Sequence, residues 1–210
     1  SPKIADNLCS SCQEHLGKVT GYLEQLNINF KLEPTLVRGF DYYTGTIFEL
    51  TSGQLDSAQN ALGGGGRYDN LVGQMGGPNL PAIGFAIGVD RTIILMKQLG
   101  IKPVLQKQSP KIYIAAMSDE FSSFVLNLLS CLRNYFTCDT NFNIKNIGKE
   151  IKWAQKNDFD FVIIIGEEEF RQNQVTIKDL RKYQQYEFSW KDEKEKIIEV
   201  LHKKWSDPEN

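Results

Sequence analysis

The sequence has no long apolar run and few cysteines. A helix needs about 20 consecutive apolar residues to cross a bilayer, and no segment of the 210 residues approaches that length. Residues 1–6 also lack the hydrophobic core of a signal peptide. The four cysteines do not make a disulfide framework, and free thiols are typical of reducing compartments. We therefore predict a cytoplasmic protein that makes no contact with a membrane.

A strong charge of either sign is also absent. The formal net charge is −2, so no basic field over the whole protein indicates a nucleic-acid partner, and any RNA contact must come from a local patch. The hydrophobic share of 41% and the charged share of 24% are those of an ordinary globular protein. The length suits one large domain or two domains of modest size.

Residue types that bind metals are few and scattered. Cys9 and Cys12 form one C-x-x-C pair, whereas a structural zinc usually takes two such pairs, and Cys131 and Cys138 are not spaced as a second one. A thioredoxin-like motif would follow a strand, and none is predicted there. We interpret the pair as incidental thiols at a helix start and predict no bound structural metal. The two histidines are likewise predicted to lie on helix surfaces: His15 and His202.

Apolar spacing divides the chain into two domains joined by a polar linker. The first domain, residues 1–99, is predicted to mix helices and strands. Its helices are expected over 10–26 and 90–99, and its strands over 42–50, near 61–62 and over 82–89. The last of these strands is an apolar run and is expected to be buried. Residues 100–109 hold Pro103 and several polar side chains, which is typical of a linker.

The second domain, residues 110–210, alternates strands with amphipathic helices. Its strands are predicted over 112–116, 161–165, 175–180 and 186–188. Its helices are predicted from a cap at Ser118, over 147–156 and after a capping sequence at 189–192. This order of elements predicts an α/β domain.

A run of four glycines, Gly63 to Gly66, is the most visible local feature. No Lys-Ser/Thr follows it and no frame fits G-x-G-x-x-G, so it is neither a P-loop nor a dinucleotide-binding turn. Such glycines either form a flexible hairpin end or let a ligand or another backbone approach closely. Arginines suited to phosphate and tyrosines suited to a pocket wall stand beside glycines in the same half of the chain. These are Arg38, Tyr42, Tyr43, Arg67, Tyr68 and Arg91.

Three segments resemble histidyl-tRNA synthetases, in the order and with the spacing of that family. They are LVRGFDYYTGTIFE at 36–49, ALGGGGRYDNLV at 61–72 and PAIGFAIGVDR at 81–91, and they resemble the histidine-binding segment, the Gly-rich strand and turn, and motif 3 of class II synthetases. The resemblance continues through 161–179, FVIIIGEEEFRQNQVTIKD, as an anticodon-binding domain. It implies an α+β part of a class II catalytic domain, with an antiparallel sheet and helices, followed by an α/β anticodon-binding domain with a mixed sheet.

On the histidine side, the resemblance implies roles for the residues that match. Arg38 corresponds to the catalytic arginine, which contacts the α-phosphate and the histidine carboxylate, and a fixed cation stabilises the charge that develops there. Tyr42 and Tyr43 correspond to tyrosines of the histidine pocket. Gly64 and Gly65, with the next glycine, leave room for the bound amino acid.

On the ATP side, Arg91 corresponds to the motif 3 arginine that binds ATP, and Gly88 gives space near the adenine. ATP is expected as its Mg²⁺ complex. The implied protein is a histidine–tRNA ligase, which activates L-histidine to histidyl-adenylate and transfers it to tRNA(His). The family's motifs 1 and 2 have no counterpart in the sequence. We therefore expect a fragment of a longer, homodimeric protein, inactive by itself.

A lysine stripe is the only local basic patch that we identify. Its members follow the spacing i, i+4, i+7, i+11 and would line one face of the helix predicted over 147–156: Lys145, Lys149, Lys152 and Lys156. Such a face is usually only solvated, but in an anticodon-binding domain it equally suits tRNA phosphates. Phe142 and Trp153 could stack on unpaired bases, although core packing is the more common role of such residues.

Two non-catalytic functions fit the same family. A regulatory paralogue, such as the subunit that controls ATP phosphoribosyltransferase, typically lacks the anticodon-binding domain and loses the catalytic arginine, whereas this sequence keeps both. An RNA-binding pseudo-synthetase would be indicated by a kinase or regulatory domain upstream. The sequence departs from the common family pattern at Phe40, where many members have Leu, and at Gly45, where some have Arg. Neither change alters the interpretation.

Overall fold

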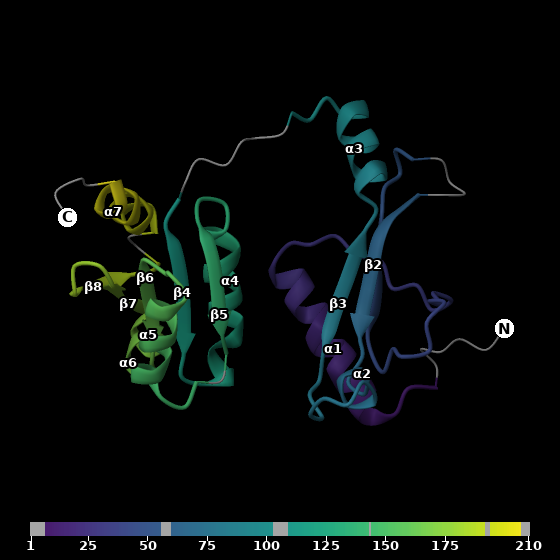
Figure 1. The fold of residues 1–210 in the computed structure, drawn as a ribbon, viewed down its shortest axis with the longest axis horizontal. Coiled ribbons are helices and arrows are strands. Elements are labelled where there is room, and N and C mark those ends of the chain that lie inside the picture. Colours follow the sequence, from purple (N-terminus) through teal and green to yellow (C-terminus); the bar gives the residue numbers. More distant parts are fainter. Residues whose placement is uncertain (1–6, 56–59, 103–108, 143, 192–193, 207–210) are drawn as a thin grey trace. The chain divides into compact units, whose positions relative to one another are not determined.

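The computed structural model describes residues 7–55, 60–102, 109–142, 144–191 and 194–206 (Figure 1). The chain divides into two compact units, one of Ser1–Leu23 and Asn29–Leu105 and the other of Glu24–Ile28 and Gln106–Asn210. This division falls within the predicted linker 100–109, of which residues 103–108 lie outside the described ranges. The bounds of the linker and of the two domains therefore stay a prediction. In the described part of the chain, no helix is long and apolar enough to cross a bilayer.

The first unit is built on a three-stranded antiparallel sheet in the order β1-β2-β3. Its elements are α1 (Ser10–Gln25), β1 (Ile47–Thr51), β2 (Ala61–Arg67), α2 (Leu71–Gln74), β3 (Ile83–Ile87) and α3 (Val89–Gln98). The predicted α+β arrangement of an antiparallel sheet with helices is confirmed.

Two strands of this sheet differ in length from the prediction. The strand expected over 42–50 begins only at Ile47. The residues before it form a loop that Arg67 ties to the sheet, because the Thr44 N–H donates to the Arg67 carbonyl at 2.9 Å and the Arg67 N–H donates to the Thr46 carbonyl at 2.9 Å. The strand expected near 61–62 instead continues through all four glycines. Glycine is a poor strand former, so pairing with β1 on one side and β3 on the other keeps this run extended.

The segment predicted as a buried strand over 82–89 forms β3, but its side chains are exposed. The exposed fraction is 72% for Ile83, 69% for Phe85 and 48% for Ile87. β3 lies at the edge of the sheet, and four of its five partner residues in β2 are glycines, which offer no side chains to pack against. The prediction of a strand was right, and the prediction of burial was wrong.

The second unit is a five-stranded mixed sheet in the order β5-β4-β6-β7-β8. Its strands are β4 (Lys111–Ala116), β5 (Thr137–Asn141), β6 (Phe161–Ile165), β7 (Gln174–Asp179) and β8 (Gln184–Ser189). Its helices are the 3₁₀ turn η3 (Asp119–Phe121), α4 (Ser122–Leu132), α5 (Ile147–Lys156), α6 (Glu167–Gln172) and α7 (Lys194–Ser206). β4 pairs in parallel with β5 and β6, whereas β6, β7 and β8 pair antiparallel. The predicted α/β fold with a mixed sheet is confirmed.

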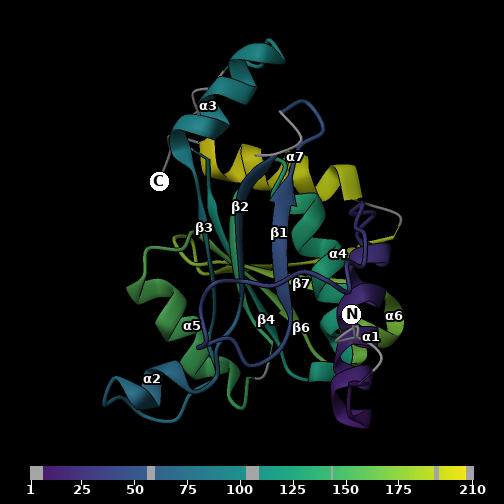
Figure 2. The same cartoon turned by 90° about the vertical axis from the view of Figure 1, so that its right-hand side faces the viewer.

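Strands β4 and β6 of this sheet are buried on both faces. Ile112 and Ile114 of β4 belong to one core cluster, whereas Tyr113 and Ala115 belong to the other. In Figure 2, α4 and α5 lie on opposite sides of these strands. Burial on both faces explains why the sequences of β4 and β6 are continuous apolar runs.

Besides α6, for which no helix was predicted, three details of the second unit were not predicted correctly. Ser118 caps the short turn η3, where its hydroxyl accepts the Glu120 N–H at 3.2 Å, and α4 begins only at Ser122. Ser189 does not open the last helix, because it is the final residue of β8 and pairs with Gln174; residues 192–193 of the predicted cap lie outside the described ranges. β5 was missed because its sequence, TCDTN, has little apolar character.

Candidate active site

The residues predicted around Arg38 meet on the three-stranded sheet, above glycines that leave space for them. A Cβ atom at Gly64 would lie 2.8 Å from Arg38 Cζ, and one at Gly66 would lie 2.8 Å from Tyr43 Cδ1. A Cβ atom at Gly84 would lie 3.1 Å from Tyr68 Cζ. We call Gly64, Gly66 and Gly84 the glycine floor. Any larger residue there would occupy the space of a side chain of the site.

The alternation of a strand explains which glycines belong to this floor. Successive residues of a strand face opposite sides of the sheet, so Gly64 and Gly66 share a face, and Gly66 pairs directly with Gly84. A Cβ atom at Gly65 would instead lie 2.7 Å from Phe85 Cα. The structure therefore brings Gly64 close to the Arg38 side chain and turns Gly65 toward β3. The histidine-binding role of both stays a prediction.

An ion pair with Glu49 holds the Arg38 guanidinium in place. Arg38 Nη1 lies 3.2 Å from Glu49 Oε1, and the two side chains are only 20% and 32% exposed. Glu49 stands on β1 directly opposite Gly64, so the pair forms across the sheet at the glycine floor. The guanidinium has five N–H donors, which allows it to bind Glu49 and an anionic ligand together. Sequence analysis missed Glu49, although it is the last residue of the quoted histidine-binding segment.

Four aromatic rings form a wall beside the guanidinium. Tyr42 lies 4.7 Å from Tyr43 and 5.7 Å from Tyr68 between ring centroids, and Phe40 stacks on Tyr42 at 5.2 Å. A side-chain hydrogen bond with Tyr43, together with burial, raises the pKa of Tyr42, so its hydroxyl stays protonated at neutral pH. The structure thus groups Tyr42 and Tyr43 as predicted and adds Tyr68, which had been noted beside the glycines but not assigned to the site.

Arg67, by contrast, connects parts of the first unit. Its Nε lies 2.8 Å from each carboxylate oxygen of Asp69, and its Nη1 lies 3.2 Å from His15 Nε2 on α1. The Asp69 N–H donates to the Thr44 hydroxyl at 3.0 Å. This network fixes the loop that carries the tyrosines. His15 is half-buried in this contact rather than a plain surface residue, whereas His202 is exposed and packs on the Phe136 ring.

Arg91 lies at the other end of β2. Its Nη1 donates to the Ala61 carbonyl at 2.7 Å, and Gly88 precedes α3 and donates its N–H to the Leu62 carbonyl at 2.8 Å. A Cβ atom at Gly88 would lie 3.5 Å from the nearest atom, an ordinary contact, so the described residues do not themselves require glycine there. Ala61 and Gly64 are three residues apart, which is about 10 Å along a strand. Arg38 and Arg91 therefore contact β2 at different points along the strand. The assignment of Arg91 to ATP and of Arg38 to the α-phosphate stays a prediction.

The lysine stripe is exposed on and beside α5. Lys149, Lys152 and Lys156 lie on the helix, whereas Lys145 precedes it, because Asn146 caps α5 by accepting the Lys149 N–H at 3.0 Å. The prediction of four lysines on one helix was wrong for Lys145. The ammonium groups of all four make no ion pair within the described residues.

The two aromatic residues near the stripe differ from each other. Phe142 packs against the hydrophobic core, which is the common role of such a residue. Trp153 is 44% exposed and lies 5.0 Å from the Tyr113 ring. Burial and the hydrogen bond to Glu150 raise the pKa of Tyr113, whose hydroxyl donates to Glu150 Oε2 at 2.6 Å and so ties α5 to β4. Trp153 therefore keeps an accessible face on the helix that carries the lysines.

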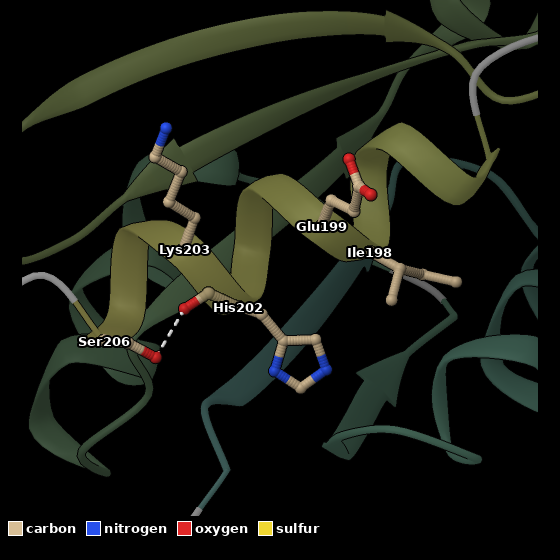
Figure 3. A pocket seen from close by; sticks show the side chains of 5 residues that line it. All are labelled: Ile198, Glu199, His202, Lys203 and Ser206. Atoms are coloured by element: carbon tan, nitrogen blue, oxygen red, sulfur yellow. Dashed lines mark hydrogen bonds between the residues drawn. The ribbon is translucent and has the colours of Figure 1, made fainter.

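A shallow hollow of about 450 Å³ lies on α7, and none of the predicted site residues lines it (Figure 3). It is lined by Ile198, Glu199, His202, Lys203 and Ser206. The Ser206 hydroxyl donates to the His202 carbonyl at 2.8 Å. Because one helix supplies the whole lining, the hollow does not enclose a ligand. Among the described residues, no group of three or more His, Cys, Asp or Glu side chains is placed to hold a metal ion.

Two family models match separate segments of the chain. Residues 4–92 match the family model described as "Histidyl-tRNA synthetase". Residues 111–200 match the family model described as "Anticodon binding domain". The first match contains the glycine floor and both arginines, and the second contains the lysine stripe.

Individual relatives agree with these two matches. The histidine–tRNA ligase of Dictyoglomus thermophilum is 37% identical over 195 residues, which cover 93% of this chain and 46% of that protein. The histidine–tRNA ligase of Clostridioides difficile is 37% identical over 186 residues, 88% of this chain and 44% of that protein. The solved structure of apo S. aureus histidyl-tRNA synthetase is 29% identical with a TM-score of 0.44, over 96% of this chain and 51% of that one. The chain spans about half the length of the curated relatives that it matches.

Proposed function

Because the chain belongs to the histidyl-tRNA synthetase family, we propose that it carries the histidine-binding wall and the anticodon-binding domain of a histidine–tRNA ligase. Such an enzyme joins L-histidine to ATP as histidyl-adenylate and then transfers the histidyl group to tRNA(His). The observation that carries this proposal is the convergence of Arg38, Tyr43 and Tyr68 on the glycine floor.

The chemistry of adenylation fits the order of side chains along β2. A histidine carboxylate oxygen attacks the α-phosphate of ATP, and the bond to pyrophosphate breaks, so negative charge gathers at one point. Arg38, held by Glu49, supplies a fixed cation for that charge. The wall of aromatic rings, of which Tyr43 contacts the site of Gly66, lies on one side of Arg38, where a tyrosine hydroxyl can hydrogen-bond an imidazole. Arg91 lies toward Ala61 on the other side, where it would meet the remaining phosphates.

The proposal extends to the substrates and partners of the whole enzyme. ATP enters as its Mg²⁺ complex, and the anticodon-binding domain contacts tRNA(His). The relatives that match are roughly twice as long as this chain, which supports a longer protein with further active-site residues. We propose that this protein acts in the cytoplasm as a homodimer.

Histidine-dependent exchange of pyrophosphate into ATP tests this proposal in the full-length protein that contains these residues. We expect exchange that requires histidine and is not supported by other amino acids. The 210-residue chain alone should show no exchange. A full-length protein that binds tRNA(His) but shows no exchange with histidine would be a non-catalytic paralogue, and the proposal would then fail.

Removing the charge of Glu49 should weaken catalysis without removing any group that touches substrate. In Glu49→Gln, Arg38 loses its ionic partner and its fixed position, so we expect kcat/KM for histidine in the exchange reaction to fall about 10-fold. Glu33→Gln is the matched control, because Glu33 also pairs with a cation, Lys31, but on the exposed surface. Equal activity of the two variants would contradict a positioning role for Glu49.

Reversing two lysine charges on α5 should weaken tRNA binding. We expect the 210-residue chain with Lys149→Glu and Lys152→Glu to bind tRNA(His) about 10-fold more weakly at moderate salt, because two phosphate contacts are lost. The slope of log K against log salt should fall by roughly 2, since each contact with a phosphate of a duplex stem contributes about 0.9. Filter binding at four or five salt concentrations measures both quantities.

The control for this measurement carries the same change of net charge elsewhere. Lys97 and Lys203 are exposed and lie on α3 and α7, so Lys97→Glu with Lys203→Glu should leave the affinity and the salt slope near those of the unmodified chain. If both double variants weaken binding equally, the effect belongs to the net charge and not to the lysine stripe.

A further inference from the structure

Two cysteines stand together at the start of α1, outside the active site. The Cys9 carbonyl accepts the Gln13 N–H at 3.0 Å, which is the first hydrogen bond of the helix, so Cys9 is its N-cap residue. Cys12 follows in the first turn of the helix. Both side chains are exposed, and residues three apart on a helix are neighbours on its surface. The two thiols can therefore reach each other and a reagent in solution.

The surroundings of the two sulfur atoms differ. Cys9 Sγ lies 3.2 Å from the Ser11 hydroxyl and receives further hydrogen bonds from the backbone and thiol of Cys12. These contacts, of which that with Ser11 is the largest, lower the pKa of Cys9 to about 7. The neighbouring Cys9 raises the pKa of Cys12. At neutral pH, a substantial share of Cys9 is thus the thiolate, whereas Cys12 is the more protonated thiol of the pair.

Within the described residues, the pair is not part of a metal site, and its surroundings differ from those of Cys138. No third His, Cys, Asp or Glu side chain is placed with the pair to complete a metal site in the described ranges. Cys138 is half-buried, and burial raises its pKa to about 12. An exposed thiolate next to an exposed thiol has the arrangement of an attacking and a resolving cysteine.

We propose that Cys9 and Cys12 form a reversible dithiol–disulfide pair that exchanges with small disulfides of the glutathione type. The Cys9 thiolate attacks one sulfur of the small disulfide, its S–S bond breaks, and one thiolate leaves and takes up a proton. Cys12 then loses its proton and attacks the Cys9 sulfur of the mixed disulfide, which expels the second small thiolate. The two cysteine thiols are oxidised to one disulfide, and the small disulfide is reduced to two thiols.

This proposal replaces the interpretation of the pair as incidental. A thioredoxin-like motif was set aside because no strand precedes it, but the hydrogen bonds to Cys9 come from the helix start itself. The pair also lies one helical turn before His15, whose ring contacts Arg67 at 3.2 Å.

The test incubates the 210-residue chain with mixtures of reduced and oxidised glutathione, stops the reaction with acid, alkylates the free thiols and identifies them by peptide mass spectrometry. We expect a Cys9–Cys12 disulfide in the unmodified chain. In Cys12→Ser, a mixed disulfide with glutathione should accumulate on Cys9. In Cys9→Ser, Cys12 loses the neighbour that raises its pKa, but it should still react at least ~10-fold more slowly at pH 7, because an ordinary thiol is mostly protonated there.

Ser11→Ala serves as the matched variant that keeps both thiols. It removes the largest contact that favours the Cys9 thiolate, so the pH profile for alkylation of Cys9 should shift to higher pH while the disulfide still forms in strong oxidant. Two results overturn the proposal: both thiols remaining free in oxidised glutathione alone, or Cys9 and Cys12 reacting at the same rate as each other in the single variants.

Discussion

Replacing Arg38 with alanine should lower kcat/KM for histidine-dependent pyrophosphate exchange by about 10² to 10³-fold in the full-length protein. The expected loss is large because a preorganised cation acts where charge develops, and Glu49 and the glycine floor already hold this guanidinium in place. Arg38→Lys should recover only part of the activity, since an ammonium keeps the charge but not the planar pair of N–H donors. Single-turnover formation of histidyl-adenylate measures the chemical step directly.

The control for this result is an arginine that also pairs with a glutamate but lies outside the site. Arg171 is 78% exposed and pairs with Glu167 within α6, so Arg171→Ala should leave exchange unchanged. Circular dichroism of each variant checks that the fold is kept. An Arg38→Ala protein that folds normally and keeps activity within about threefold of the original would remove Arg38 from the catalytic machinery.

The second unit was predictable because its core obeys simple periodicity. Phe161–Ile165 is a continuous apolar run, and it forms a strand buried on both faces. β5 escaped prediction because it is an edge strand whose alternate residues meet solvent. In the first unit, the same apolar signal gave the position of β3 but not its exposure, since burial depends on what packs against a strand and not on its own sequence.

Sequence analysis named Arg38, Tyr42 and Tyr43, which lie together in the structure, but it did not predict how the glycines make room for them. The glycine run was ambiguous among a hairpin end, close approach of a ligand and close approach of another backbone. The structure shows the backbone approach at Gly65, and it also shows glycines that make room for Arg38 and Tyr43. Tyr68 joins the wall because it lies over Gly84, which is distant in sequence. Arg67 is of a residue type suited to binding phosphate, but in the structure its guanidinium contacts Asp69 and His15 instead. Such pairings depend on strand register, which local spacing does not encode.

The same register makes Gly65 the most sensitive glycine for stability. A Cβ atom there would lie 2.7 Å from both Cα and Cβ of Phe85, and closer still to the Gly84 carbonyl oxygen. These are atoms of the adjacent strand that no rotamer change can move away, so β2 and β3 would have to separate. We expect Gly65→Ala to lower the free energy of unfolding of the first unit by about 2–4 kcal/mol.

The position of the tryptophans allows this effect to be assigned to one unit. All three, Trp153, Trp190 and Trp205, belong to the second unit, so their fluorescence in a urea titration reports that unit alone. Hydrogen exchange of peptides from β1 to β3 reports the first. In Gly65→Ala, protection of these peptides should fall while the fluorescence midpoint stays in place. Gly53→Ala, with no atom within 4 Å of its added Cβ, should change neither. Unchanged protection in Gly65→Ala would mean that β2 and β3 do not pair as closely as their register requires.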